Sequence, residues 1–349
     1  MPSPPGQSAA LLMGCALRRL REEGERYFEP ARIDFQPVPS VQGAGPRVLQ
    51  VQVRNSARPC NVFIKSFLPA DESPESLCLA RERLRREYAA LVQLHAMAAR
   101  HPGLSVSRPI ACFPEELCMV TEQVPGVKLR SLLHWRRPWQ SPEMWTRKLL
   151  PVFGGLGTWV GVFQQCGAAG GRLSLGALQT YLETRLQTLQ QRFPGLLGAS
   201  ERISILRQYE RLSREVDAED LAEVSVHADF CPDNVVVNGA EVTVLDFEMT
   251  RTGAKYSDVS HMYMHIDNLK VKPWIGRVIA QRFQDAMLQG YDPALKRSRP
   301  MFQLCLLINV VCHFARLATT KLSLRETLQH KYLWKNHWHW LTSLGRANS

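Results

Sequence analysis

The sequence predicts an α+β protein with two lobes, a small β-rich lobe followed by a larger, mainly helical one. With 349 residues the chain is longer than one minimal hydrophobic core requires and shorter than three domains would need. Alternating β-type runs lie mostly before Val124-Pro-Gly126, which breaks the pattern like a hinge, and long helix-forming stretches dominate after it. We therefore expect an N-terminal extension at 1–46, a β-rich first lobe at 47–123 and a mainly helical second lobe at 124–349.

Composition describes an ordinary globular protein, with 45% hydrophobic and 21% charged residues. The formal charge of +11 favours anionic partners in general, without distinguishing nucleic acid, membrane surface or phosphorylated metabolite. The nine cysteines are scattered and odd in number, with no C-x-x-C pair, which argues against a disulfide framework or zinc site and for a reducing compartment. No basic segment precedes Ala9–Met13, so we expect no signal peptide and a cytoplasmic location.

The first elements expected are a helix within Cys15–Tyr27 and a loop over Pro37–Pro46. A hairpin follows, with alternating strands at Arg47–Gln52 and Asn61–Phe67. Lys65 stands among apolar residues of the second strand. It is either an edge-strand lysine facing water or a lysine directed into a cleft that binds phosphate.

A helix is expected from Glu75 to about Arg100, because Ser73-Pro74 is typical of a helix start. Its apolar positions make one stripe, formed by Leu84, Tyr88, Leu91 and Leu94. Glu87 lies beside that stripe, so its side chain can point toward the sheet and form an ion pair that positions Lys65. The alternative is a plain surface glutamate.

Two more strands are expected at Arg108–Phe113 and Leu117–Gln123. In the second lobe, Trp145–Cys166 contains a G-x-G-x-x-x-G pattern that we interpret as close helix packing, because its third glycine is one residue late for a dinucleotide fingerprint. Met301–Leu317 is the most apolar segment; it contains polar side chains and is short for a bilayer, so a buried core helix is expected.

The segment Val226–Glu248 organises the prediction. Two β-rich runs, Asn234–Val237 and Val242–Leu245, flank a turn at Asn238-Gly239, which predicts a hairpin. Strand pairing would bring the polar side chains at its two ends together, and these are Asp229, Asn234 and Asp246. Oxygen ligands gathered in this way suit a divalent cation bound to a polyphosphate.

The spacing His227-x-Asp229-x-x-x-x-Asn234 is that of a kinase catalytic loop, and Asp246-Phe-Glu248 falls where D-F-G would follow. In that chemistry Asp229 is the base or orienter of the attacking hydroxyl, and Asn234 and Asp246 are Mg²⁺ ligands.

Other residues would support the same chemistry. Lys65, held by Glu87, would bind the nucleotide phosphates. His227 is expected to hold the loop by hydrogen bonds rather than to titrate. Asp258 is a candidate anchor for the backbone of the catalytic loop.

The sequence resembles the aminoglycoside phosphotransferase and choline kinase-like enzymes, a small-molecule branch of the protein-kinase-like fold, over about residues 47–317. The motifs that carry the resemblance are Phe63-Ile-Lys65, Arg86-Glu-Tyr88, Met119–Gly126, His227-x-Asp229-x-x-Pro232-x-Asn234 and Val244-Leu-Asp246-Phe-Glu248. Ala228, where eukaryotic protein kinases usually carry arginine, fits this branch. No A-P-E motif follows, so a protein kinase is less expected.

The resemblance implies ATP or GTP, Mg²⁺ and transfer of the γ-phosphoryl group to a hydroxyl. It also implies that the lobe at 47–123 binds the nucleotide and that the lobe at 124–349 carries the catalytic residues and binds the acceptor. The base of the nucleotide would contact the backbone between Glu122 and Val124. One departure is the loop Arg54–Arg58, which has no glycine where the phosphate loop is expected.

After Asp258 basic residues far outnumber acidic ones. The basic residues are Lys270, Lys272, Arg277, Arg282, Lys296, Arg297, Arg299, Arg316, Lys321, Arg325, Lys331, Lys335 and Arg346, against Asp267, Asp285, Asp292 and Glu326. Because a polycationic aminoglycoside needs an acidic pocket, we expect a neutral or anionic acceptor such as a sugar, glycan precursor or glycolipid headgroup. The alternatives are an aminoglycoside-type antibiotic kinase and a catalytically silent nucleotide-binding scaffold. No nucleic-acid partner is expected.

The C-terminal tail and a pair of histidines can each be interpreted in two ways. The tail Tyr332–Trp340 mixes indoles with basic residues, so it is either a helix packed on the lobe or a peripheral contact with the inner face of a membrane. His261 and His265 are four residues apart on an expected helix, which suits either metal ligation or the wall of a core or pocket.

Overall fold

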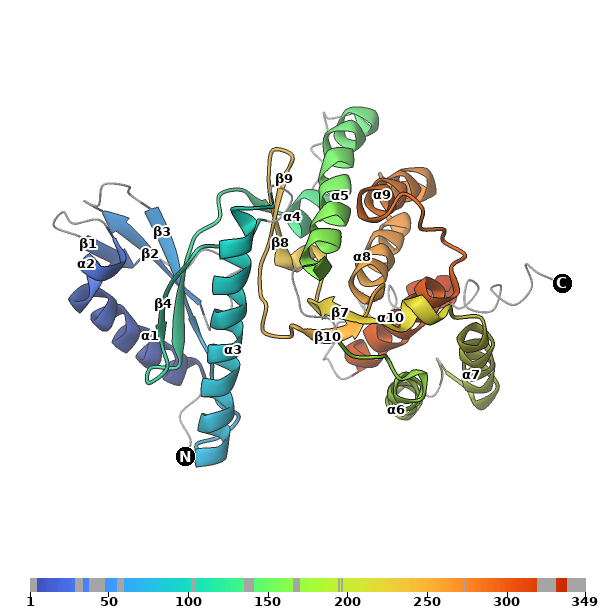
Figure 1. The fold of residues 1–349 in the computed structure, drawn as a ribbon, viewed down its shortest axis with the longest axis horizontal. Coiled ribbons are helices and arrows are strands. Elements are labelled where there is room, and N and C mark those ends of the chain that lie inside the picture. The colour runs from blue at the N-terminus through green and yellow to red at the C-terminus, as the bar shows by residue number, and fades with distance from the viewer. Residues whose placement is uncertain are drawn as a thin grey trace. The chain divides into compact units, whose positions relative to one another are not determined.

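The computed structural model describes residues 5–28, 34–37, 48–54, 60–101, 105–134, 141–165, 170–193, 195, 197–272, 274–318 and 331–337. They form two compact units, each described by itself. The first comprises Met1–Val127, Val236–Asn238 and Thr243–Thr250, and the second comprises Lys128–Val235, Gly239–Val242 and Arg251–Ser349. The first is built around a sheet and the second mainly from helices, as the sequence predicts (Figure 1).

The first unit contains a five-stranded antiparallel sheet with strand order β1-β2-β3-β5-β4. Its strands are β1 (Asp34–Pro37), β2 (Val48–Arg54), β3 (Cys60–Ser66), β4 (Pro109–Phe113) and β5 (Cys118–Glu122), and its helices are α1 (Pro5–Glu22), α2 (Gly24–Tyr27) and α3 (Pro74–Ala98). The hairpin β2–β3, the helix α3 and the strands β4 and β5 confirm the predicted elements. The side chain of Ser73 caps α3 by accepting a hydrogen bond from the Ser76 N–H.

Side-chain alternation on β3 and β5 determines which helix each residue faces. Val62, Ile64 and Val120 are buried in one core together with apolar residues of α1. Phe67 and Met119 are buried in a second core together with Leu84 of α3. Since successive side chains of a strand point to opposite faces, Lys65 lies on the face covered by α3.

The first helix begins earlier than the sequence analysis expected. Alpha-helical structure runs over Pro5–Glu22, whereas the prediction began at Cys15. The apolar residues Ala9, Met13, Ala16, Leu17 and Leu20 recur at helical spacing and are buried against the sheet. Helix α1 and strand β1 therefore belong to the packed first unit. Most of the predicted loop at 37–46, and most of the loop joining β2 to β3, lie outside the described residues.

The second unit is mainly helical. Its helices are α4 (Leu129–His134), α5 (Pro142–Gln165), α6 (Leu175–Arg192), α7 (Ala199–Arg214), α8 (Ser257–Asp267), α9 (Gly276–Tyr291) and α10 (Pro300–Ala318), with short 3₁₀ turns at Ala218–Leu221, Pro232–Asn234 and Asn268–Val271. Helix α5 carries the glycine pattern. A Cβ on Gly157 would meet the Met287 carbonyl oxygen at 2.0 Å, which confirms that this glycine allows α5 and α9 to pack closely.

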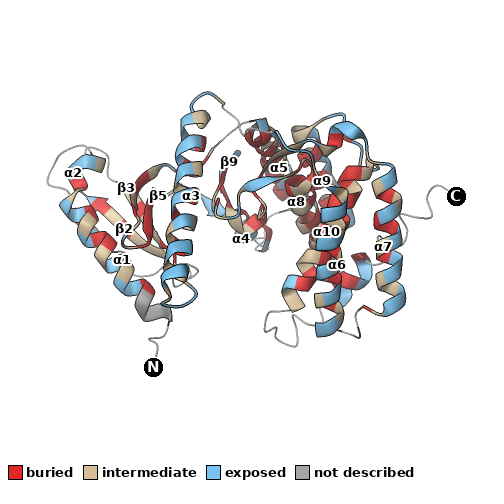
Figure 2. Ribbon diagram, turned by 60° about the horizontal axis from the view of Figure 1, so that its bottom comes forward, coloured by how far each residue is buried: buried red, intermediate tan, exposed pale blue. Residues whose placement is uncertain are grey.

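Helix α10 is the core helix of the second unit (Figure 2). Among the described residues it is the one helix long and apolar enough to cross a bilayer, yet 61% of that apolar stretch is buried inside the fold. This burial confirms the predicted core helix. A short helix at 331–337 packs beside it, with Trp334 buried and its ring 4.9 Å from that of Phe314. The packing interpretation of the tail is thus confirmed for Trp334, while Trp338 and Trp340 lie outside the described residues.

The predicted hairpin near the end of the catalytic motif is present. Strands β8 (Val235–Asn238) and β9 (Glu241–Val244) belong to a short sheet of order β6-β8-β9, where β6 is Val127–Lys128. Gly239 in the turn has φ +64°, a conformation that glycine adopts without strain. A second small sheet pairs β7 (Glu223–Val226) with β10 (Arg251–Ala254). In the sequence, β7 precedes His227 and β10 follows Glu248.

Candidate active site

Lys65 and Glu87 form the predicted ion pair within the first unit. The Lys65 Nζ donates hydrogen bonds to both carboxylate oxygens of Glu87, at 3.0 and 2.9 Å. Because β3 lies between β2 and β5, Lys65 is on an inner strand and the edge-strand interpretation is wrong. Only 2% of the Glu87 side chain is exposed, so Glu87 is a core residue and not a surface glutamate.

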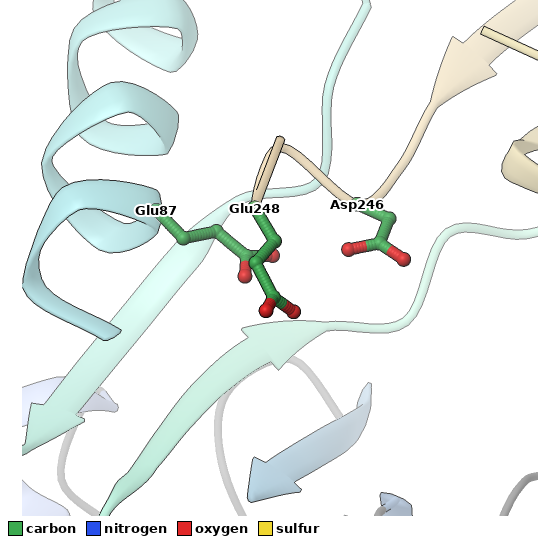
Figure 3. A group of neighbouring side chains, drawn as sticks. All are labelled: Glu87, Asp246 and Glu248. Carbon is green, nitrogen blue, oxygen red and sulfur yellow. The ribbon is translucent and has the colours of Figure 1, made fainter. Parts of the chain in front are cut away.

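Lys65 also reaches Asp246, whose carboxylate oxygen accepts a hydrogen bond from Nζ at 2.8 Å. With Glu87 and Glu248, Asp246 forms a cluster of three carboxylates whose oxygens lie within 4.8 Å of one another (Figure 3). We call Lys65 and these three acidic residues the carboxylate cluster. Glu248 pairs with Arg83 at 2.9 Å and was not among the predicted site residues, although it lies in the predicted motif.

The electrostatics of the carboxylate cluster favour a further cation. Burial raises the pKa of Glu87 to about 7, even though Lys65 lowers it, and the charges of Asp246 and Glu248 add to the rise. Burial lowers the pKa of Lys65, but Glu87 and Asp246 outweigh this effect, so the Lys65 pKa is raised. Three carboxylates beside one lysine and one arginine provide the hard oxygen donors that Mg²⁺ prefers.

The backbone at Asp246 supports a functional role. Asp246 has φ +69° and Ala228 has φ +62°, both in the left-handed region that residues with a side chain seldom adopt. Such conformations cost about 1–3 kcal/mol each and cluster at functional sites. Each of the two lies in one of the two predicted catalytic motifs.

Replacing Glu87 with Gln should remove a pH dependence from the stability of the protein. The folded-state pKa of about 7 lies above the ordinary value of 4.5. The folded protein therefore binds the proton more tightly, and this stabilisation is full below pH 4.5 and is lost as pH rises through 7. Over that window we expect the free energy of unfolding of wild type to fall by about 3 kcal/mol relative to that of Glu87→Gln. Urea unfolding at several pH values measures it.

The matched control is Glu82→Gln on the same helix, where 59% of the Glu82 side chain is exposed. Its stability curve should run parallel to that of wild type. A Glu87→Gln curve that is also parallel to wild type would show that Glu87 is not a buried, proton-binding group.

In the second unit, Asn234 holds Asp229. The Asn234 side-chain amide donates to the Asp229 Oδ2 at 2.9 Å and to the Asp229 backbone carbonyl at 3.0 Å. The structure thus brings these two predicted residues together. Since Nδ2 faces Asp229, the Asn234 Oδ1 is directed away from that carboxylate and can serve as an oxygen ligand for a metal. Asp246 belongs to the first unit and is described there.

His227 and Asp258 hold the backbone of this loop. The Asp258 carboxylate accepts hydrogen bonds from the His227 N–H at 2.7 Å and the Ala228 N–H at 2.9 Å, which confirms the predicted anchor. Burial raises the Asp258 pKa to about 6, against the effect of these two bonds. His227 is fully buried, and its Nδ1 accepts a hydrogen bond from the Asp229 N–H at 3.3 Å. These contacts match the expected loop-holding role.

Replacing Asp258 with Asn should loosen the loop. The amide keeps one acceptor oxygen but turns an NH₂ group toward the second backbone N–H, which leaves that donor unsatisfied. An unsatisfied buried donor costs about 1–3 kcal/mol, and we expect that loss of unfolding free energy together with a fall in kcat. Urea unfolding and steady-state kinetics measure the two effects. Asp285→Asn on α9, where 64% of the side chain is exposed, should change neither; a similar loss in that control would contradict a specific anchor.

One contact at this loop was missed by the sequence analysis. The Arg316 guanidinium, near the end of α10, lies 3.6 Å from the Asp229 Oδ1. The sequence identified Arg316 only as one of many basic residues. Its position relative to Asp229 depends on how α10 packs, which local patterns do not reveal.

The residues predicted to contact the nucleotide base lie in the first unit. Glu122 ends β5, and its N–H donates to the Arg108 carbonyl oxygen at 2.9 Å. Val124 follows two residues later. The predicted phosphate loop at Arg54–Arg58 lies largely outside the described residues.

Comparison with known proteins agrees with the fold. The model of the phosphotransferase enzyme family (APH) matches residues 72–297. Similar solved structures include a macrolide 2′-phosphotransferase from Brachybacterium faecium (14% identity, covering 90% of this chain and 97% of that chain, TM-score 0.52). Ethanolamine kinase from Plasmodium vivax is also similar (12% identity, covering 97% of this chain and 95% of that chain, TM-score 0.54). So is a glucosamine kinase (16% identity, covering 99% of this chain and 85% of that chain, TM-score 0.53).

At these identities the solved structures establish the fold alone, which is the α+β, protein-kinase-like fold. A search of curated proteins gave no match. The family model covers well over half of the chain and includes Glu87, Asp229, Asn234 and Asp246. This chain therefore belongs to the phosphotransferase enzyme family.

Proposed function

We propose that this phosphotransferase moves the γ-phosphoryl group of ATP, or alternatively GTP, to a hydroxyl of a neutral or anionic small molecule. Sugars, glycan precursors and glycolipid headgroups are the acceptor classes that we favour. The observation that carries the proposal is the Asp229 carboxylate, which has one oxygen held by Asn234 and the other 3.6 Å from a cation, the Arg316 guanidinium. A base in such surroundings suits an uncharged or negatively charged acceptor.

In the second unit we assign Asp229 as the base that accepts the proton of the acceptor hydroxyl. Asn234 orients that carboxylate through its NH₂ group and offers its amide oxygen to Mg²⁺. His227 and Asp258 fix the backbone around Asp229 through buried hydrogen bonds. Little covalent chemistry is asked of the protein, because phosphoryl transfer depends mainly on positioning and on stabilisation of charge.

In the first unit we assign Lys65 to the nucleotide phosphates, with Glu87 holding its ammonium group. Asp246 is the second proposed Mg²⁺ ligand, and the backbone between Glu122 and Val124 is assigned to the nucleotide base. The excess of carboxylates around Lys65 fits a divalent cation. When bound, Mg²⁺ would neutralise charge on the phosphates.

The charge of the second unit supports the choice of acceptor. A cavity of about 1170 Å³ there is lined by Lys270, Arg277 and Arg297, and Asp267 is the one carboxylate among its described lining residues. Asp267 already pairs with Lys270 and accepts a hydrogen bond from Gln284 at 3.0 Å. Asp229 and Arg316 are not among the described lining residues, so this cavity reports the basic character of the second unit rather than the acceptor site itself. That basic character disfavours a polycationic acceptor and so an aminoglycoside-type kinase.

Competition between acceptors tests this proposal. Purified protein is given ATP, Mg²⁺ and a matched set of a neutral hexose, its phosphorylated form and the corresponding amino sugar, with an aminoglycoside as the cationic extreme. We expect kcat/KM to be lowest for the cationic acceptors. A clear preference for the aminoglycoside would favour an antibiotic kinase.

A silent scaffold is the second candidate. The residues whose loss usually marks such relatives are all retained here, and they are Lys65, Glu87, Asp229, Asn234 and Asp246.

Membrane contact through the tail is a separate proposal that concerns Trp338 and Trp340. Co-sedimentation with liposomes, before and after removal of the residues following Thr327, would test it.

A further inference from the structure

The two oxygens of the Asp229 carboxylate have different surroundings. Oδ2 accepts the hydrogen bond from Asn234, whereas Oδ1 lies beside Arg316. A hydroxyl that gives its proton to Oδ1 would therefore approach next to the Arg316 guanidinium. Since 65% of the Arg316 side chain is exposed and a guanidinium has five N–H donors, Arg316 can contact Asp229 and a second anion together.

Three histidines lie in the same region of the second unit. His261 and His265 occupy one face of α8, with ring centroids 4.8 Å apart, and His313 of α10 lies 5.6 Å from His265. His313 is three residues before Arg316, so the two share a face of α10. We call Arg316 and these three histidines the Arg–His cluster.

The Arg–His cluster contains a buried polar atom that lacks a hydrogen-bond partner among the described residues. The Nε2 of His265 is shielded from solvent and has no hydrogen-bond partner among the described residues. A buried polar atom without a partner destabilises the fold, so native proteins usually supply a partner for it. Burial, together with His261, lowers the pKa of His265, so its ring is neutral at pH 7 and carries one N–H donor.

The geometry does not fit a metal centre made by these histidines. Among the described residues, Glu87, Asp246 and Glu248 are the one group of three ligand side chains whose donor atoms lie within 4.8 Å of one another. The rings of the Arg–His cluster are spread more widely. An extended set of donors suits an anion with several oxygens better than a single ion.

Two carboxylates of the catalytic loop have cationic partners. Asp233 of the catalytic loop pairs with Arg130 at 2.7 Å, and Asp229 lies beside Arg316. Lys272 adds another positive charge and donates to the Leu133 carbonyl oxygen at 3.1 Å. A cationic acceptor group would therefore meet repulsion here, whereas an anionic group would be attracted.

We propose that the acceptor carries an anionic group, a phosphate or a carboxylate, close to its reacting hydroxyl, and that the Arg–His cluster binds this group. The inference rests on the proposed function and narrows its acceptor class. In the reaction, the acceptor oxygen bonds to the γ-phosphorus, the bond between that phosphorus and the β–γ bridging oxygen breaks, and ADP leaves. The hydroxyl proton goes to Asp229, while Arg316 binds the acceptor anion.

Kinetics with matched sugars tests the role of Arg316. Glucose, glucose 1-phosphate and glucuronate share a hydroxylated ring and differ in charge. A charge-assisted hydrogen bond is worth about 1.5–3 kcal/mol, so Arg316→Gln should lower kcat/KM for the two anionic sugars by about tenfold or more, mainly through KM. Because Arg316 also lies beside Asp229, the value for glucose should fall as well, so the decisive quantity is the ratio of kcat/KM for each anionic sugar to that for glucose, which should fall about tenfold or more. Arg282→Gln on α9 replaces another partly exposed arginine, which pairs with Glu143, and should leave all three values unchanged.

Binding without nucleotide separates this inference from the proposed function. Histidine-labelled protein is titrated with inorganic phosphate, glucose 1-phosphate or glucose and followed by NMR, with the His265 resonance assigned by His265→Gln. We expect a shift with the two anions and none with glucose, and Arg316→Gln should weaken binding of the anions by about tenfold or more.

Anion binding at His265 without transfer to any acceptor would contradict the proposed function and leave the anion site standing. Transfer to glucose as efficient as transfer to its anionic forms, with no His265 shift, would overturn the anion site and leave the phosphotransferase standing. Absence of a His265 shift with both anions, whatever the kinetics, also overturns the anion site.

Discussion

Replacing Asp229 with Asn is expected to lower kcat by about 10²–10⁴-fold, because an amide cannot accept the proton of the attacking hydroxyl. The substituted side chain still has an oxygen that can accept the Asn234 hydrogen bond, which keeps the loop in place. The nucleotide contacts assigned to the first unit are untouched. We therefore expect the loss in kcat, with little change in the KM for ATP.

Asp233→Asn is the matched control, since it makes the same chemical change four residues away. Asp233 is 44% exposed and pairs with Arg130 on the surface of the second unit. Its kcat should stay within about threefold of wild type, as is usual for a surface ion pair. If Asp229→Asn retained as much activity as Asp233→Asn, Asp229 would not be the base.

Replacing Lys65 with Met should reduce kcat/KM for ATP by about 10²–10³-fold, the usual cost of removing one preorganised charge from a transferring phosphate. It should also destabilise the first unit in a pH-dependent way. Without Lys65 the buried Glu87 loses its partner, so its pKa rises further above the wild-type value of about 7. At pH 6 Glu87 can take up a proton and the stability loss should be small, whereas at pH 8 it should be larger.

Steady-state kinetics with varied ATP measures the first effect, and urea unfolding at pH 6 and pH 8 measures the second. Lys128→Met changes an exposed lysine in β6 and should alter neither quantity. In the double variant Lys65→Met/Glu87→Gln the extra loss at pH 8 should disappear, because no buried carboxylate is left unpaired. An unchanged kcat/KM for ATP in Lys65→Met would contradict the assignment of Lys65 to the phosphates.

Local patterns predicted much of the first unit. Alternation identified β2 and β3, Ser73 identified the start of α3, and Asn238-Gly239 identified the turn between β8 and β9. Each signal lies within a few residues of the element that it specifies. The pair Lys65–Glu87 was also predictable, because strand alternation and helical phase both direct these side chains toward the space between sheet and helix.

Other features depend on packing between distant segments. Arg316 and Asp229 are far apart in sequence, and their contact follows from how α10 lies in the second unit. The same is true of His313 beside His265. Glu248 could have been recognised from its place two residues after Asp246, but its approach to Glu87 requires the φ of +69° at Asp246, which sequence alone does not specify. The early start of α1 was hidden because small residues form part of its buried stripe.

The fate of the γ-phosphoryl group shows whether Asp229 serves as the base of a phosphoryl transfer. Wild-type and Asp229→Asn proteins are incubated with γ-labelled ATP, Mg²⁺ and the set of hydroxylated acceptors, and label is followed into an acid-stable phosphate ester. We expect one labelled ester per ADP formed by wild type, dependent on acceptor, and almost none with Asp229→Asn. Label released only as inorganic phosphate, or equal ester formation by the two proteins, would contradict it.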